Sequence, residues 1–369
     1  MTDGPTTSPP SILLIDDDET LLEALQAELA DVIGNGSPEI RTWLPTAQEP
    51  SAEEAFQAKI DDGTVLVVTD YDLTSRGERG LFGPSIVEWC QNKTIPVGDY
   101  SRKHGGLPSE PNLFEVRVPT DTGQAAPFIA ATYRGFKRIH DELVAKPNLM
   151  TERSPALVLA NLLSHPSAQG EFSLYISWLS SANSGLIEKL RLAAPPNSSP
   201  SPADKVSLLS YVAGHVLLNA ILKYPGPILS DEALCAYTAV NSDEIATVAP
   251  LFETARYTGP FSDMRRYFWR EAADSILDEL ATGIAGQEFE TFGELNRCAI
   301  ENRLKTTLRR HACTRCNGQN GGFYCPFTRR SVCPRSDCSV GASSWIPQGA
   351  QLCRIERDFY EEWAPLLGL

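Results

Sequence analysis

The sequence has no apolar run long enough to cross a membrane. A spanning helix needs roughly 18 consecutive apolar residues, and the runs here are much shorter. Residues 1–10 lack the basic and apolar segments of a secretory signal and are predicted to form a disordered polar tail. We therefore expect a cytoplasmic protein with no membrane partner.

Positive charge is also scarce. The 369 residues include 32 Lys and Arg against 47 Asp and Glu, giving a net charge of -15. Such a chain is not expected to bind nucleic acid through its whole surface. No P-loop, dinucleotide-binding glycine pattern or catalytic triad is present. The hydrophobic content of 42% predicts a globular chain, and its length suits two or three domains.

Two short apolar runs each end in aspartates. Residues 11–19 read SILLIDDDE, and residues 64–73 read TVLVVTDYDL. Such runs are typical of buried parallel strands, and open α/β sheets bind ligands at the carboxyl ends of their strands. Clustered carboxylates disfavour each other's charged form, and Mg²⁺ would offset that repulsion because it prefers oxygen ligands. The residues expected in this acidic pocket are Asp16, Asp17, Asp18, Asp70 and Asp72.

These stretches resemble the receiver domain of two-component response regulators. In ILLIDDDE, Asp16 and Asp17 match the family's paired metal-binding acids. In VVTDYDL, Asp70 matches the phosphoacceptor, and the backbone carbonyl of Asp72 matches the third protein ligand of Mg²⁺. In TIPVGDYS, Ser101 matches the hydroxyl residue at the end of the fourth strand. The resemblance implies a flavodoxin-like α/β domain with a parallel five-stranded sheet, which we place at residues 11–147.

Two features depart from the receiver pattern. The segment RKHGGLPSEPN, between the fourth and fifth strands, is poor in helix formers, so the fourth helix is predicted to be short or missing. The family also places a phosphate-binding lysine at the end of the fifth strand. Here EVRVP offers Arg117, and Lys103 in the neighbouring loop is a second candidate. Arginine is not a simple replacement for lysine, so both candidates stay open.

Residues 151–300 are predicted to be mostly helical, because apolar residues recur at helical spacing. Near residues 226–262, two short helices have the size of a helix-turn-helix, with Ser230 and Ser242 as expected N-caps. The second helix would begin with Asp243 and Glu244, whose carboxylates would repel DNA phosphates. A winged-helix-like unit that is structural or binds protein is therefore favoured over a DNA-binding unit.

Residues 301–369 form a cysteine-rich segment. Cys313-x2-Cys316 has the spacing of half a tetrahedral zinc site. Cys333 and Cys338 would complete a Cys₄ zinc ribbon, while Cys325 or His311 could instead supply a ligand. The surrounding Gly, Asn, Pro and Ser cannot build a core alone, so four of the five cysteines are predicted to hold a structural Zn²⁺. Reduced cysteines without an ion and an iron–sulfur cluster are the alternatives.

The same segment concentrates positive charge, since residues 302–336 contain no Asp or Glu. This stretch could contact nucleic acid, an acidic partner or the acidic face of the receiver domain, or it could be a solvated face. Its cations are Arg303, Lys305, Arg309, Arg310, Arg315, Arg329, Arg330 and Arg335.

Together, the resemblance predicts a phosphorelay protein that accepts a phosphoryl group on Asp70 from a histidine kinase. Ser101 and either Arg117 or Lys103 would hold the product, and no other catalysis is expected. Without a recognisable effector, the chain would act as an adaptor or as a phosphoryl sink that competes with another receiver. The arrangement resembles auxiliary receivers of bacterial defence operons. The alternatives are a DNA-binding transcriptional response regulator and a degenerate receiver that serves as a protein-interaction scaffold.

Overall fold

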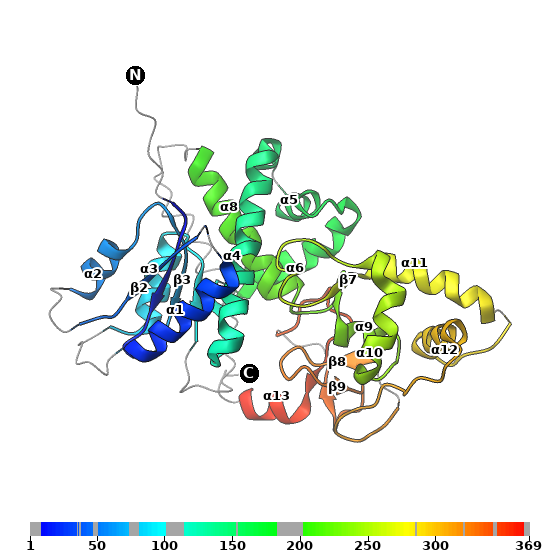
Figure 1. The fold of residues 1–369 in the computed structure, drawn as a ribbon. Helices are drawn as coiled ribbons and strands as arrows, with labels where there is room; N and C mark the ends of the chain where they lie inside the picture. Colours follow the sequence, from blue (N-terminus) through cyan, green and yellow to red (C-terminus); the bar gives the residue numbers. More distant parts are fainter. Residues whose placement is uncertain are drawn as a thin grey trace. The chain divides into compact units, whose positions relative to one another are not determined.

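The chain forms two compact units in a computed structural model (Figure 1). Among the described residues, the first unit comprises 9–100, 114–151 and 202–215, and the second comprises 152–182 and 216–364. The predicted boundaries separate residues 202–215 from the α/β domain, whereas the structure groups them with it. The structure describes residues 9–34, 36, 38–46, 51–73, 81–100, 114–152, 154–182, 202–284, 286–319, 322–341 and 345–364.

A five-stranded parallel sheet lies at the centre of the first unit, as predicted. Its strand order is β2-β1-β3-β4-β5, and every neighbouring pair is parallel. This is the flavodoxin-like order 2-1-3-4-5, in which the order reverses between β1 and β3. The strands are β1 (Ser11–Ile15), β2 (Glu39–Trp43), β3 (Thr64–Thr69), β4 (Val97–Asp99) and β5 (Val116–Arg117).

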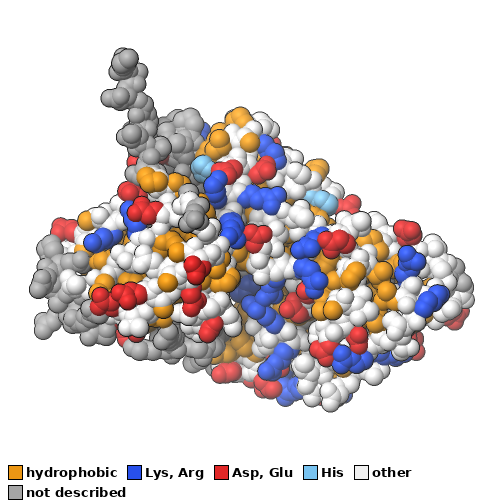
Figure 2. Space-filling model, in the orientation of Figure 1, with side chains coloured by type: hydrophobic (Ala, Val, Ile, Leu, Met, Phe, Trp, Pro, Cys, Tyr) orange, Lys and Arg blue, Asp and Glu red, His pale blue; other side chains and the backbone are white. Residues whose placement is uncertain are grey.

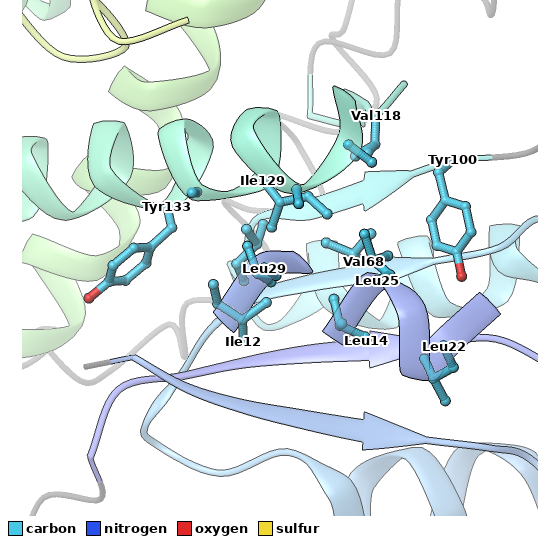
Figure 3. Packing of buried hydrophobic residues seen from close by; sticks show 14 residues of the cluster. Ile12, Leu14, Leu22, Leu25, Leu29, Val68, Tyr100, Val118, Ile129 and Tyr133 are labelled. Atoms are coloured by element: carbon cyan, nitrogen blue, oxygen red, sulfur yellow. The ribbon is translucent and has the colours of Figure 1, made fainter. Parts of the chain in front are cut away.

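Helices cover both faces of this sheet. Figure 3 shows Leu25 and Leu29 of α1 and Ile129 of α4 packed toward Ile12 and Leu14 of β1. The alternate β1 residues belong to a second cluster, with α2 and α3 on the opposite face. Burial on both faces explains why the β1 sequence is continuously apolar. The helices are α1 (Glu19–Ile33), α2 (Ala52–Lys59), α3 (Gly83–Asn92) and α4 (Thr122–Ala145).

Helix α8 (Pro202–Val216) contributes residues 202–215 to the first unit. Gly214 permits a close approach to α4, because a Cβ there would lie 2.2 Å from the Phe136 ring. His215 is fully buried and makes edge contacts with Phe114, Phe136 and Tyr211. Its burial lowers the pKa of His215 to about 3, so this histidine is a neutral member of an aromatic core.

The second unit begins as a mostly helical region, as predicted. One apolar core cluster of this unit gathers residues from several of its helices and from a short antiparallel strand pair, β6 and β7. The elements are α5 (Pro155–Leu162), α6 (Gln169–Ala182), β6 (Ile228–Ser230), α9 (Asp231–Tyr237), α10 (Ile245–Val248), β7 (Tyr267–Trp269), α11 (Arg270–Ala281) and α12 (Phe292–Leu304).

The predicted helix-turn-helix corresponds to α9 and to a second helical segment at residues 242–255, in which short 3₁₀ turns flank α10. Ser230 caps α9 as predicted by accepting a hydrogen bond from the Ala233 N–H. The predicted cap Ser242 is wrong. Asn241 caps the second segment instead, because its side chain accepts a hydrogen bond from the Asp243 N–H at 3.0 Å. A winged-helix arrangement stays a prediction.

The C-terminal part of the second unit has little regular structure. Its strands form the antiparallel pairs β8–β9 and β10–β11. In the part of the chain that the structure describes, no helix combines the length and the apolar character needed to cross a membrane. The elements are β8 (Phe323–Tyr324), β9 (Ser331–Val332), β10 (Ser339–Val340), β11 (Ile355–Glu356) and α13 (Arg357–Trp363).

Candidate metal centres

The carboxyl ends of β1 and β3 bring three aspartates together. Ile15 and Thr69 are paired at the ends of these neighbouring strands, and Asp16, Asp17 and Asp70 follow directly. The Asp70 N–H donates to the Ile15 carbonyl at 3.0 Å, which fixes the two strand ends against each other. One carboxylate oxygen from each aspartate lies within 4.8 Å of the other two. We call Asp16, Asp17 and Asp70 the carboxylate group.

The other two predicted acids have different positions. The Asp18 side chain is exposed and caps α1, accepting hydrogen bonds from Thr20 and Leu21 N–H groups at 3.0 and 3.2 Å. Asp72 is half-buried, and its backbone forms an isolated antiparallel bridge with Phe82. The Asp72 side chain is outside the carboxylate group. A metal-binding role for the Asp72 carbonyl stays a prediction.

The surroundings of Asp16 disfavour an isolated negative charge. The residue is only 2% exposed, and this burial raises the pKa of Asp16. Two hydrogen bonds lower the pKa in part, one from the Tyr100 hydroxyl and one from the Asp18 N–H at 2.7 Å. The charges of Asp70 and Asp17 raise the pKa again. Asp16 therefore favours either a proton or a nearby cation.

The surroundings of Asp70 also disfavour an isolated negative charge. Burial raises the pKa of Asp70, and hydrogen bonds from the Tyr71 and Asp72 backbone lower it. The charges of Asp17 and Asp99 raise it further. A hard divalent cation would relieve this repulsion, and carboxylate oxygens are the ligands that Mg²⁺ prefers. The donor set of the carboxylate group therefore fits Mg²⁺.

Two residues near the carboxylate group were not identified from the sequence. Asp99, at the end of β4, is 8% exposed and influences Asp70 electrostatically. Tyr100 follows it and donates its hydroxyl hydrogen to Asp16. Both lie in TIPVGDYS, directly before Ser101. The rule that strand ends gather functional side chains would have found them had it been applied to the fourth strand.

The backbone of Asp70 lies against the start of α3. The Gly83 N–H donates to the Tyr71 carbonyl at 2.9 Å. A Cβ at Gly83 would lie 2.5 Å from the Asp70 carbonyl oxygen, which is closer than any real side chain permits. Glycine at this position therefore allows the close contact that helps to position Asp70.

Of the three residues predicted to bind phosphate, Arg117 is among the described residues. Ser101 and Lys103 lie outside the described residues, as does the segment predicted to lack the fourth helix. Arg117 is exposed on β5, between the buried residues Val116 and Val118. Strand register pairs Arg117 with Asp99 of β4. The roles of Ser101, Lys103 and Arg117 stay predictions.

Four of the predicted zinc ligands also converge, namely Cys313, Cys316, Cys333 and Cys338. Cys325 is outside this group, and its sulfur accepts a hydrogen bond from the Glu356 N–H at 3.3 Å. His311 is outside it as well, since its Nδ1 accepts one from the Gly322 N–H at 3.1 Å. The fold therefore brings together one set of four among the candidate ligands that spacing left open. The cysteines whose sulfurs lie within 4.8 Å of one another, here called the thiol group, are Cys313, Cys316, Cys333 and Cys338.

No protein-family model, curated protein or solved structure matches this chain. Its function is therefore inferred from the carboxylate group, the thiol group and the folds that hold them.

Proposed function

We propose that the first unit accepts a phosphoryl group on Asp70, with Mg²⁺ held by Asp16, Asp17 and Asp70, as a two-component receiver domain does. The observation that carries this proposal is the convergence of the three carboxylates at the ends of β1 and β3. These strands flank the point where the strand order reverses. In open α/β sheets, that switch point is where ligands bind.

Within the carboxylate group, Asp70 is the best placed to be the nucleophile. Asp16 is 2% exposed, and each of its carboxylate oxygens accepts a hydrogen bond. Asp70 is half-buried and so is open to a phosphodonor. Backbone hydrogen bonds from Tyr71 and Asp72 favour its charged form. Asp16 and Asp17 are left to serve as metal ligands.

The proposed transfer is a simple displacement at phosphorus. A carboxylate oxygen of Asp70 forms a bond to the phosphorus atom of a phosphohistidine or a small acyl phosphate. The bond from phosphorus to the donor breaks, and its electron pair leaves with the donor. A histidine donor then takes up a proton from water at the nitrogen that carried the phosphoryl group, whereas an acyl phosphate leaves as a carboxylate that stays ionised. Bound Mg²⁺ would offset charge on the phosphoryl oxygens. Ser101 and either Arg117 or Lys103 are proposed to contact the product.

A histidine kinase is the proposed phosphodonor, and an adaptor or phosphoryl-sink role follows from the lack of a recognisable effector. Asp and Glu side chains gather over the region of α1 on the visible face (Figure 2). In receivers, a partner must approach the strand end where the acids converge. We therefore propose that the partner docks beside the carboxylate group, at the start of α1.

The charge pattern of the second unit gives the DNA-binding alternative less support. Arg309 forms ion pairs with Asp243 at 3.0 Å and with Glu244 at 2.7 Å, at the start of the second helical segment. The basic stretch at 302–336 is thus used largely within its own unit. Its residues with carboxylate partners in that unit are Arg309, Arg310, Arg315, Arg330 and Arg335.

Intact mass after incubation with Mg²⁺ and acetyl phosphate tests the proposal. The wild type should gain about 80 Da, the mass of one phosphoryl group, and Asp70→Asn should not. Asp18→Asn is the matched control, because Asp18 lies in the same acidic stretch but outside the carboxylate group. It should gain the same mass as the wild type. Equal labelling of Asp70→Asn would contradict the assignment, and a wild type that takes up neither phosphoryl group nor Mg²⁺ would favour a scaffold.

A further inference from the structure

The thiol group lies in the second unit and does not depend on the proposed phosphoacceptor. We propose that Cys313, Cys316, Cys333 and Cys338 bind one structural Zn²⁺ as four thiolates, and that this ion holds the C-terminal segment of the second unit in its fold. The proposal rests on sulfur geometry, on the loops that carry the sulfurs and on the make-up of the local core.

The sulfur spacing matches two ligands of one ion. The Sγ atoms of Cys316 and Cys333 are 3.8 Å apart, and neither residue is in a disulfide. A disulfide would need a separation of about 2 Å. A tetrahedral ion with Zn–S bonds of about 2.3 Å places its sulfurs about 3.8 Å apart. The Cys316 and Cys333 sulfurs therefore already stand at the edge length of a zinc tetrahedron, and all four sulfurs lie within 4.8 Å of one another.

The first pair of cysteines sits in a tight turn that aims both sulfurs at one point. The Asn317 N–H donates to the Cys313 carbonyl at 2.8 Å, and the Cys313 N–H donates to the Gly318 carbonyl at 3.1 Å. Asn317 adopts a left-handed φ of 54° to close this turn. The Gly318 N–H then donates to the Cys316 sulfur at 3.3 Å. A backbone N–H directed at sulfur favours the thiolate, which is the form that binds metal.

The second pair is held opposite the first by backbone hydrogen bonds. Thr314, inside the first turn, donates its N–H to the Ser331 carbonyl at 3.0 Å, and Ser331 belongs to the strand that leads to Cys333. The Cys338 carbonyl in turn accepts the N–H of Arg357 at 3.0 Å, the first residue of α13. An ion that joins the two pairs would therefore also hold the start of the last helix.

The thiol group forms a small buried cluster of its own, separate from apolar residues of the same segment such as Val332 and Ile355. Cys313, Cys333 and Cys338 are at most 1% exposed, and with Cys316 they form a cluster of their own. Four small side chains bury little apolar area, so this cluster contributes little hydrophobic stabilisation. A bound ion would supply stabilisation that the cysteine side chains alone do not provide, as it does in small zinc modules.

One positive side chain, Arg354, lies next to two of the four cysteines in the fold and would offset part of the charge of four thiolates on one Zn²⁺. Arg354 donates to the Ser339 hydroxyl at 2.6 Å and to the Pro334 carbonyl at 3.4 Å, beside Cys333 and Cys338. Such outer contacts tune and orient metal ligands. The arrangement therefore has features of a closed structural site.

Metal analysis of the purified full chain under reducing conditions tests the proposal. The wild type should carry about one zinc per chain. The zinc content of Cys316→Ser and of Cys333→Ser should each be at least tenfold lower. Cys325→Ser is the matched control, since Cys325 is buried in the same segment but outside the thiol group. It should keep its zinc. Asp70→Asn should keep it too, so failure of this proposal is distinguishable from failure of the phosphoacceptor proposal.

A second measurement covers variants that fail to fold. The wild-type zinc is exchanged for Co²⁺, and the absorption spectrum should show intense thiolate-to-cobalt bands and a tetrahedral pattern. A wild-type chain that takes up neither Zn²⁺ nor Co²⁺ while reduced would overturn the proposal. So would stoichiometric iron, or loss of zinc from Cys325→Ser with retention in Cys316→Ser.

Discussion

The carboxylate group and the thiol group stand in opposite relations to the folds around them. The carboxylates follow strands whose two faces are each covered by a full apolar core. The cysteines form a small cluster of their own in a segment with short strands and few helices. We expect Mg²⁺ to exchange without unfolding the first unit, and Zn²⁺ to be required for the end of the second. Donor type and the size of the surrounding core together indicate whether a metal serves chemistry or folding.

The largest expected effect is that of zinc removal. A chelator under reducing conditions should remove an ion whose binding contributes on the order of 10 kcal/mol to folding in small zinc modules. Protease cleavage within residues 311–364 should then rise more than tenfold, while the sheet of the first unit stays protected. Removal of Mg²⁺ alone should change neither region. Limited proteolysis followed by mass spectrometry measures the cleavage of both units. Equal loss of protection in the two units would contradict the expectation that Zn²⁺ is required only for the end of the second unit.

A substitution in the apolar core of the first unit should destabilise that unit and leave zinc binding unchanged. Leu25 of α1 is 1% exposed and packs in the cluster that Figure 3 shows. Leu25→Ala should lower the free energy of unfolding of the first unit by about 3 kcal/mol, because it removes buried methyl groups and leaves a cavity. Leu21→Ala, on the same helix but only partly buried, is the control and should cost less. Urea unfolding followed with zinc analysis should show unchanged zinc in both variants.

The contact between Gly83 and Asp70 links packing to chemistry. Gly83→Ala should cost about 2 kcal/mol, as overpacked sites do, because its Cβ would meet the Asp70 carbonyl at 2.5 Å. Phosphorylation should fall as Asp70 is displaced. Gly170→Ala is the control, since nothing lies within 4 Å of its Cβ. Thermal unfolding measures the loss of stability, and intact mass measures the rate of phosphorylation. Phosphorylation of Gly83→Ala at the wild-type rate would contradict this account.

The smallest effect concerns charge in the carboxylate group. Asp70→Asn should stabilise the metal-free chain slightly, because burial raises the pKa of Asp70 and so disfavours the ionised carboxylate that the amide replaces. Since burial raises the pKa values of Asp16 and Asp70, the folded state binds more protons than the unfolded state above their ordinary values. This contribution to stability is therefore present at low pH and is lost as pH rises through the raised pKa values. Unfolding measured across pH, without metal, should show a weaker pH dependence in Asp70→Asn.

Mg²⁺ affinity should respond to pH in the opposite direction. Protons and Mg²⁺ compete for the same carboxylates, so affinity should fall as pH drops through the raised pKa values of Asp16 and Asp70. Calorimetric titration with Mg²⁺ at several pH values measures this, and an affinity that does not change with pH would indicate that Mg²⁺ binds elsewhere.

The first unit was largely predictable because its signals are local. A continuous apolar run that ends in aspartate identifies both a buried strand and the edge where it stops, and so places Asp16 and Asp70 together. The Asp18 cap was likewise visible beside its helix. Asp99 and Tyr100 were missed although their strand was predicted, because only Ser101 was considered at its carboxyl end.

The second unit was less predictable because its decisive contacts join distant residues. Spacing alone could not choose among the cysteines, since Cys325 lies between the chosen pairs in sequence but turns toward Glu356. The sequence left open whether the basic stretch is an interaction surface or a solvated face, and it gave no sign that Arg309 pairs with Asp243 and Glu244, more than sixty residues earlier in the chain. Pairing of this kind leaves no periodic pattern.

The most direct test of the central claim is to locate the phosphoryl group chemically. Borohydride reduces an aspartyl phosphate to homoserine, and peptide mapping then identifies the residue. After treatment with Mg²⁺ and acetyl phosphate, the account predicts homoserine at position 70 and unchanged aspartate at Asp16, Asp17 and Asp18. Homoserine at any of those three positions instead, or none in a chain that binds Mg²⁺ and meets its kinase, would contradict it.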